Sequence, residues 1–313
     1  MIVKILQPRL SAGSFGGVSY NTNKVDRDKG ELMKVANFGP LQALSQLRPQ
    51  DYINYLQMIS ARNKNVRKPQ FHVAISSKGK LYDKHTLTDV AEAWLKEMGY
   101  GAQPYLIVFH KDTVNNHVHI VSTRVDREGN KIDSGFERRR SQKAMNKILG
   151  YDYALAYNFS TRAQFLLLLE IKGYPGRDMN VQQRVEDYKP DKRRIEEINA
   201  IFVAMRNERD FIHVLRDKYN IDLVFHAAEG KRPYGYTIID HEEKNVFKGS
   251  EVMPLKVLLN EWVEWKSFSN HENAGGLSGA PQLKGINLSD DVDDEAILGP
   301  TRRRKQKSRT NLR

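Results

Sequence analysis

Cysteine is absent from the 313 residues of this chain. Its absence excludes disulfide bonds, a catalytic thiolate and sulfur ligands, so a metal could be held only by nitrogen and oxygen atoms. Long hydrophobic runs are missing as well: the longest, at 165–169, is far shorter than the roughly 20 residues that span a bilayer. The first apolar stretch ends at Pro8, too early for a signal peptide. We therefore expect a soluble, cytoplasmic protein with no membrane insertion.

Positive charge is in excess. The chain has 50 basic and 38 acidic residues, a formal net charge of +12 and a pI near 9.6. This balance favours a polyanionic partner, either nucleic acid or an anionic membrane surface. Many basic proteins bind neither, so the charge becomes informative only beside a second feature.

That second feature is a cluster of histidines. Three histidines and one aspartate lie within ten residues: His110, Asp112, His117 and His119. Runs of β-branched and aromatic residues flank them at 105–109 and 120–125. These runs predict two strands joined by a short polar connection at 111–116.

This geometry predicts a metal site. His117 and His119 are two residues apart on one strand, so their imidazoles share a face, and His110 can reach that face across the connection. Three neutral imidazoles suit a divalent metal with open coordination positions, Mn²⁺ or Zn²⁺ better than Mg²⁺, although Mg²⁺ is abundant. Asp112 could orient a histidine or accept a proton. The alternative is that these histidines are merely polar residues on an exposed strand.

The elements expected up to residue 157 describe an α+β unit. Strands are predicted at 2–7, 31–38, 70–76, 105–109 and 120–125, and helices at 49–62, 86–98 and 136–149. The short connection between the histidine strands favours antiparallel pairing. We therefore expect a central antiparallel sheet with its flanking helices on one face.

The sequence changes character after residue 158. Helices are predicted at 160–172, 191–206, 208–219 and 251–265, and strands at 221–226, 234–239 and 245–248. We expect a first domain at 1–157, a small α+β unit at 158–266 and a charged, disordered tail at 267–313.

A metal site on a basic protein suggests a phosphodiester substrate. If water attacks, the protein is a hydrolase. If a side chain attacks, a tyrosine would make cleavage reversible by storing the bond in a protein–DNA ester. Tyr20 stands out because a glycine-rich segment precedes it and Lys24, on the same helical face, could hold phosphate. The alternative is that Tyr20 is an ordinary packed tyrosine.

The histidine segment His110-x-Asp112-Thr113-x-Asn115-x-His117-x-His119 resembles the third motif of mobilisation relaxases. These MobP-like relaxases are tyrosine nucleases of the HUH endonuclease superfamily. A tyrosine that precedes the histidines is similar to the order in relaxases rather than in rolling-circle replication initiators. The resemblance covers roughly residues 1–150.

The resemblance implies that Tyr20 is the nucleophile, that the three histidines bind the metal, and that Asp112 is a base or an orienting residue. It also implies nicking of one DNA strand at the origin of transfer of a plasmid or mobile element, in a bacterial cytoplasm. The products would be a 5′-phosphotyrosyl link and a free 3′-OH, rejoined after transfer. The implied partners are single-stranded and hairpin origin DNA, an accessory DNA-binding protein and the coupling protein of a secretion channel.

Further basic residues are candidate DNA contacts: Lys24, Arg138, Arg139, Arg140 and Lys248. The alternative for the three arginines is a solvated helix face, and the alternative for Lys248 is a structural hairpin. For His72 we favour a satisfied core histidine over a position near the site. Two other functions stay open: a metal-dependent phosphodiesterase that uses water, and a non-catalytic nucleic-acid-binding protein. A covalent DNA adduct would discriminate among the three.

Overall fold

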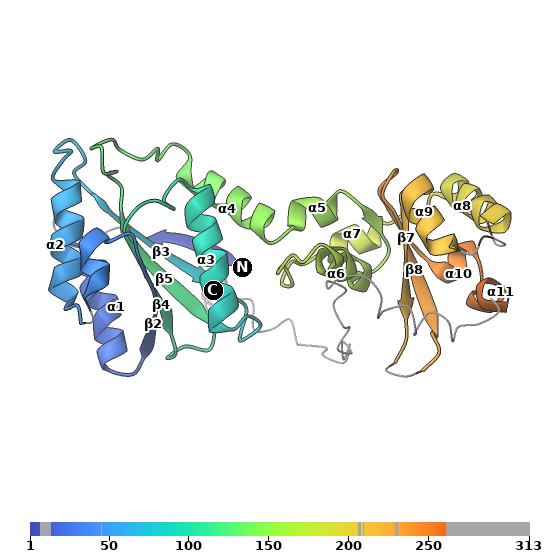
Figure 1. Cartoon of the computed structure of the whole chain (residues 1–313), viewed down its shortest axis with the longest axis horizontal. Helices are drawn as coiled ribbons and strands as arrows, with labels where there is room; N and C mark the ends of the chain where they lie inside the picture. Colours follow the sequence, from blue (N-terminus) through green and yellow to red (C-terminus); the bar gives the residue numbers. More distant parts are fainter. Residues whose placement is uncertain (7–13, 45, 206–207, 209, 229–230, 261–313) are drawn as a thin grey trace, which may run out of the picture.

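The computed structural model describes residues 1–6, 14–44, 46–205, 208, 210–228 and 231–260. The predicted tail lies outside the described residues. The chain forms two sheets, drawn at opposite ends of Figure 1, with short helices between them. This arrangement confirms the predicted α+β class.

The first sheet is five-stranded and antiparallel, in the order β1-β3-β5-β4-β2. Its strands are β1 (Ile2–Leu6), β2 (Gly30–Ala36), β3 (Gln70–Ser76), β4 (Tyr105–His110) and β5 (His117–Thr123). The two histidine strands are β4 and β5, and they pair as predicted, with His110 opposite His117. Because β5 is the middle strand, its side chains are covered on both faces.

Helices cover both faces of this sheet, so the expectation of one covered face is wrong. On one face, α3 (Lys84–Glu97) packs Trp94 into the core with Ile120 of β5. On the other, α1 (Gly16–Asp26) and α2 (Pro49–Ser60) pack against Val121 of the same strand. The physical reason is that the central strands are apolar on both faces, which leaves neither face for solvent.

Helix α1 is absent from the predicted order of elements. Of its eleven residues only Gly17, Val18 and Asn21 are buried, too few for an apolar helical periodicity. Its first turn follows Phe15, which is buried in a left-handed backbone conformation with φ 43°. Helix α1 lies on the sheet face that carries the histidines, and this position decides the geometry of the site.

The second sheet has the order β6-β9-β8-β7. Its strands are β6 (Asn158–Phe159), β7 (Ile221–His226), β8 (Gly235–Asp240) and β9 (Asn245–Lys248). Between the two sheets lie α4 (Glu137–Ile148), α5 (Tyr151–Leu155), α6 (Arg162–Ile171) and α7 (Gln182–Glu186), and against the second sheet lie α8 (Lys192–Met205), α9 (Phe211–Tyr219), α10 (Gly249–Val252) and α11 (Leu255–Asn260).

One expectation for this part changes. The helix expected at 251–265 is divided into α10 and α11 at Pro254, which removes a backbone donor, and its last residues lie outside the described part. The predicted domain boundary at residue 157 stays a prediction. Buried side chains run continuously past that position, from Trp94 to Val246 of β9. Among the described residues, no helix is both long enough and apolar enough to cross a membrane.

Candidate active site

The three histidines of the motif converge on one face of the first sheet. One ring nitrogen of each of His110, His117 and His119 lies within 4.8 Å of the others. The rings of His110 and His119 stack with their centroids 4.3 Å apart. His110 and His119 are buried and His117 is half-buried. The cluster is therefore closed on the side of the sheet and open near His117.

Burial keeps the His110 and His119 imidazoles neutral. It lowers the pKa of His110 to about 4, with a further contribution from His117. It lowers the pKa of His119 to about 2, with a further contribution from His110. A neutral imidazole has a lone pair to offer, so the donor set fits a divalent metal that accepts nitrogen ligands.

Hydrogen bonds fix which nitrogen of each ring is free, and we assign the hydrogens from this network. His117 Nδ1 lies 3.0 Å from the carbonyl oxygen of Asn115 and therefore donates to it. His119 Nδ1 lies 2.9 Å from His72 Nε2. The Asn21 amide nitrogen lies 3.4 Å from the same His72 atom, which is then the acceptor for both. The lone pairs of His117 and His119 are consequently on Nε2.

Sequence reasoning missed Asn21 and favoured only one of the two roles that it weighed for His72. Asn21 is only 1% exposed, and its Oδ1 accepts from His110 Nε2 at 2.8 Å. Its amide nitrogen donates to the carbonyl oxygen of Gly17 at 2.7 Å. His72 is buried, as expected of a core histidine, but it also contacts His119. The only sequence signal for His72 was a polar residue inside an apolar strand.

Tyr20 lies over the cluster. Its ring centroid is 5.7 Å from that of His110 and 5.8 Å from that of His119. It remains 47% exposed, so a substrate can reach it. Helix α1 positions Tyr20 there, because its neighbour Asn21 is buried and holds the same helical turn against the histidines.

Asp112 binds Lys24 rather than a histidine in the part of the chain that the structure describes. The two side chains form an ion pair. The hydrogen bond from Lys24 lowers the pKa of the Asp112 carboxyl, and the same bond raises the pKa of Lys24. The Lys24 ammonium also lies 5.9 Å from the centroid of the Tyr20 ring. A charged pair thus borders the candidate nucleophile.

Comparison with known proteins agrees with this geometry. Residues 20–150 match the family described as relaxase, MobA/VirD2-like, nuclease domain. The chain carries a relaxase nuclease domain. No curated protein and no solved structure matches it. Relaxases are metal-dependent proteins that bind and nick DNA, so the metal-binding potential of the histidines and the basic charge acquire a common explanation.

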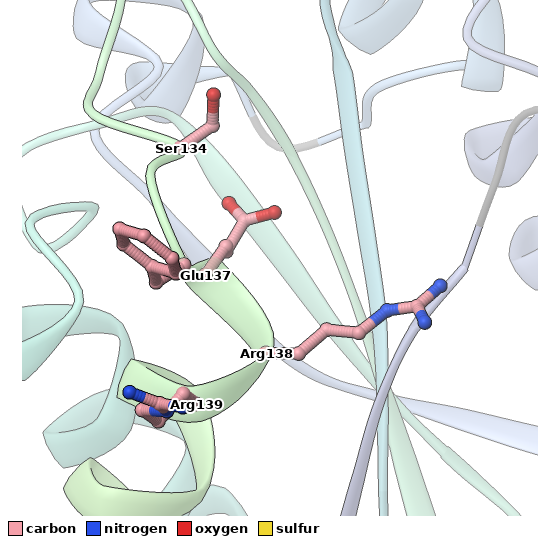
Figure 2. A pocket seen from close by; sticks show the side chains of 5 residues that line it. Ser134, Glu137, Arg138 and Arg139 are labelled. Atoms are coloured by element: carbon pink, nitrogen blue, oxygen red, sulfur yellow. The ribbon is translucent and has the colours of Figure 1, made fainter.

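The other candidate DNA contacts of the relaxase lie away from the histidines. Arg138, Arg139 and Arg140 lie in the first turn of α4, which packs on α3, on the opposite face of the first sheet. Figure 2 shows Arg138 and Arg139 extending from α4 in different directions. Lys248 ends β9 in the second sheet. Of the predicted basic contacts, Lys24 alone is brought to Tyr20 by the described part of the chain.

Proposed function

We propose that this relaxase nicks one DNA strand at an origin of transfer by attack of Tyr20 on the scissile phosphate, in conjugative mobilisation of a plasmid or mobile element. The observation that carries the proposal is the position of Tyr20. It is an accessible phenol beside the clustered imidazoles of His110 and His119, on a protein whose family nicks DNA.

His110, His117 and His119 would hold the divalent metal, Mn²⁺, Mg²⁺ or Zn²⁺. When bound, the metal would polarise a phosphate oxygen and offset the charge that builds up in the transition state. The hydrogen bonds from His117 to Asn115 and from His119 to His72 keep the two rings in fixed orientations.

Tyr20 Oη forms the new bond to phosphorus while the bond from phosphorus to the 3′ oxygen breaks. The phenolic proton ends on the leaving 3′-hydroxyl, so the strand keeps a free 3′-OH and its 5′-phosphate is esterified to Tyr20. Attack by a 3′-OH on this ester reverses the step and rejoins the strand. No external energy source is required, because one phosphodiester is exchanged for another.

Asp112 and Lys24 act together in this proposal. Their ion pair holds the carboxylate charged and the ammonium beside the Tyr20 ring. When Lys24 turns to a DNA phosphate, Asp112 loses the hydrogen bond that lowers its pKa and becomes a stronger base for the phenolic proton.

The proposed DNA is a hairpin with an adjoining single strand, because a scissile phosphate must be unpaired to reach Tyr20. Lys248 would add a phosphate contact, and an accessory DNA-binding protein and a coupling protein would complete the transfer machinery.

A single-stranded oligonucleotide from the DNA beside the gene, labelled and incubated with Mn²⁺ or Mg²⁺, tests the proposal. We expect a covalent protein–DNA band on a denaturing gel, which disappears with a chelator and in Tyr20→Phe and His117→Ala. Tyr234→Phe is the matched control, since Tyr234 is 79% exposed yet belongs to the second unit. It should form the adduct as the unaltered protein does.

Other outcomes point to the other functions. Cleavage that persists in Tyr20→Phe without an adduct would favour a phosphodiesterase that activates water. DNA binding that survives His117→Ala, without cleavage of oligonucleotides tiled across the neighbouring DNA, would favour a non-catalytic binding protein.

A further inference from the structure

An exposed aromatic side chain marks the start of α4. Phe136 is 83% exposed, although burying a phenylalanine is strongly favourable. Its backbone is left-handed, with φ 45° and ψ 31°, a conformation that bulky residues rarely adopt. The fold therefore holds an apolar ring in solvent at an unfavourable backbone conformation. Packing does not explain this combination, whereas binding of a ligand to the ring would.

Of the four arginines near this ring, two pair with carboxylates and two do not, within the part of the chain that the structure describes. Arg124 forms a two-pronged ion pair with Glu137, at 2.7 and 2.9 Å, and Arg140 pairs with Asp133. Both nearby carboxylates are thereby occupied. Arg138 and Arg139 are exposed and form no ion pair within the described residues.

The ring and the arginines form one surface. Phe136, Arg138 and Arg139 line a shallow pocket of about 390 Å³ together with Ser134 and Glu137, seen in Figure 2. The Arg139 guanidinium carbon lies 6.0 Å from the centroid of the Phe136 ring. We name Phe136, Arg138 and Arg139 the Phe136 surface.

The Phe136 surface is remote from Tyr20. Glu137 pairs with Arg124, which follows the last residue of β5, whereas His117 is the first residue of that strand. Arg124 is seven positions after His117 along this extended chain, a span of about 23 Å at ~3.3 Å per residue. Helix α4 also packs on α3, on the other face of the sheet. A nucleotide held here is not the one that is cleaved.

We propose that the Phe136 surface is a second binding site for single-stranded DNA, where Phe136 stacks on an unpaired base and the two arginines bind the adjoining phosphates. An exposed ring with free guanidinium groups offers both contacts that sequence-tolerant binding of single strands requires. The inference rests on the proposed function only in taking DNA as the substrate. It adds a site that holds the strand away from the nick.

The test is binding of a fluorescent oligothymidylate of about 16 nucleotides, which is the largest number of nucleotides that one OB-fold domain typically covers. The full-length protein carries Tyr20→Phe and is kept in chelator, so that no cleavage can interfere. Affinity is measured over a series of salt concentrations for Phe136→Ala, Phe136→Trp and Arg138→Ala. Lys256→Ala removes a control charge from an exposed lysine on α11.

Each variant has its own expected signature. Phe136→Ala should weaken binding about five- to 150-fold with an unchanged salt slope, and Phe136→Trp should restore it. Arg138→Ala should lower the slope of log affinity against log salt by about 0.7. Lys256→Ala should change neither. Affinity and slope that are unchanged in both Phe136→Ala and Arg138→Ala would overturn the second site. So would an equal loss of affinity for duplex DNA in Phe136→Ala. Because no cleavage is measured, either result leaves the Tyr20 proposal to its own test.

Discussion

At the scale of single residues, His72 and Asn21 orient two of the candidate metal ligands through hydrogen bonds. His72 Nε2 accepts from His119 and from Asn21, and Asn21 accepts from His110. Burial also lowers the pKa of His72 to about 4, so Nε2 is unprotonated at neutral pH and can accept these hydrogen bonds. Residues that orient metal ligands in this way typically matter almost as much as the ligands.

We predict that His72→Leu weakens binding of Mn²⁺ by roughly 10- to 100-fold, because His119 Nδ1 loses its acceptor and the ring its fixed orientation. His72→Gln should recover part of the affinity, since an amide oxygen can accept the same hydrogen bond. Calorimetric titration of the metal into each variant measures this. His213→Leu, at an exposed position on α9, is the control. Equal affinities for His72→Leu and the unaltered protein would contradict the orienting role.

At the scale of elements, the approach of α1 to β3 sets the position of Tyr20. Gly17 donates its backbone N–H to Gln70 Oε1 at 2.8 Å. A Cβ atom at Gly17 would lie 3.0 Å from that oxygen and 3.0 Å from His72 Nδ1. Both neighbours are buried and hydrogen-bonded, so neither can move away easily.

Gly17→Ala is therefore expected to push α1 away from the sheet and to lower the free energy of unfolding by about 1–3 kcal/mol, as overpacking does. Adduct formation should fall as well, since Tyr20 moves with the helix. Gly235→Ala is the matched control, because a Cβ there has no atom within 4 Å. Urea unfolding and the adduct gel measure the two effects. A stable Gly17→Ala protein with full adduct formation would show that the close approach is dispensable.

Elements also show what the sequence could and could not predict. The histidine strands were predictable because runs of β-branched and aromatic residues and a two-residue histidine spacing are local signals. The remaining parts of the site depend on distant contacts. Asn21 and His110 are 89 residues apart in the chain, and His72 and His119 are 47 apart. A polar helix such as α1, with few buried residues, has no periodicity that reveals which strands it covers.

At the scale of the whole molecule, a side-chain network fastens the second sheet to the helices that follow the nuclease domain. Tyr157, buried just after α5, bonds His241 Nδ1 through its hydroxyl at 2.6 Å. His241 Nε2 lies 3.0 Å from Asp222 Oδ2, and Arg216 donates to the other oxygen of Asp222 at 2.6 Å. Asp222 on β7 is thus the negative centre of the network. The hydrogen bond from His241, and then that from Arg216, lowers the pKa of Asp222 to about 2.

This lowered pKa predicts how stability changes with pH. An aspartate in the unfolded chain has a pKa of about 3.9. Because the folded value is lower, the stabilisation by Asp222 is complete above about pH 4 and is lost as the pH falls toward 2. Asp222→Asn should then lower the free energy of unfolding by about 1–2 kcal/mol at neutral pH, with a difference from the unaltered protein that shrinks below about pH 4.

Urea unfolding of both proteins across this pH range measures the difference directly. Asp217→Asn, at an exposed position on the neighbouring helix α9, should unfold like the unaltered protein at every pH. If the difference for Asp222→Asn is the same at neutral and at acid pH, the carboxylate charge does not hold the network. The Tyr157 and His241 contacts would then have to fasten the second sheet without Asp222.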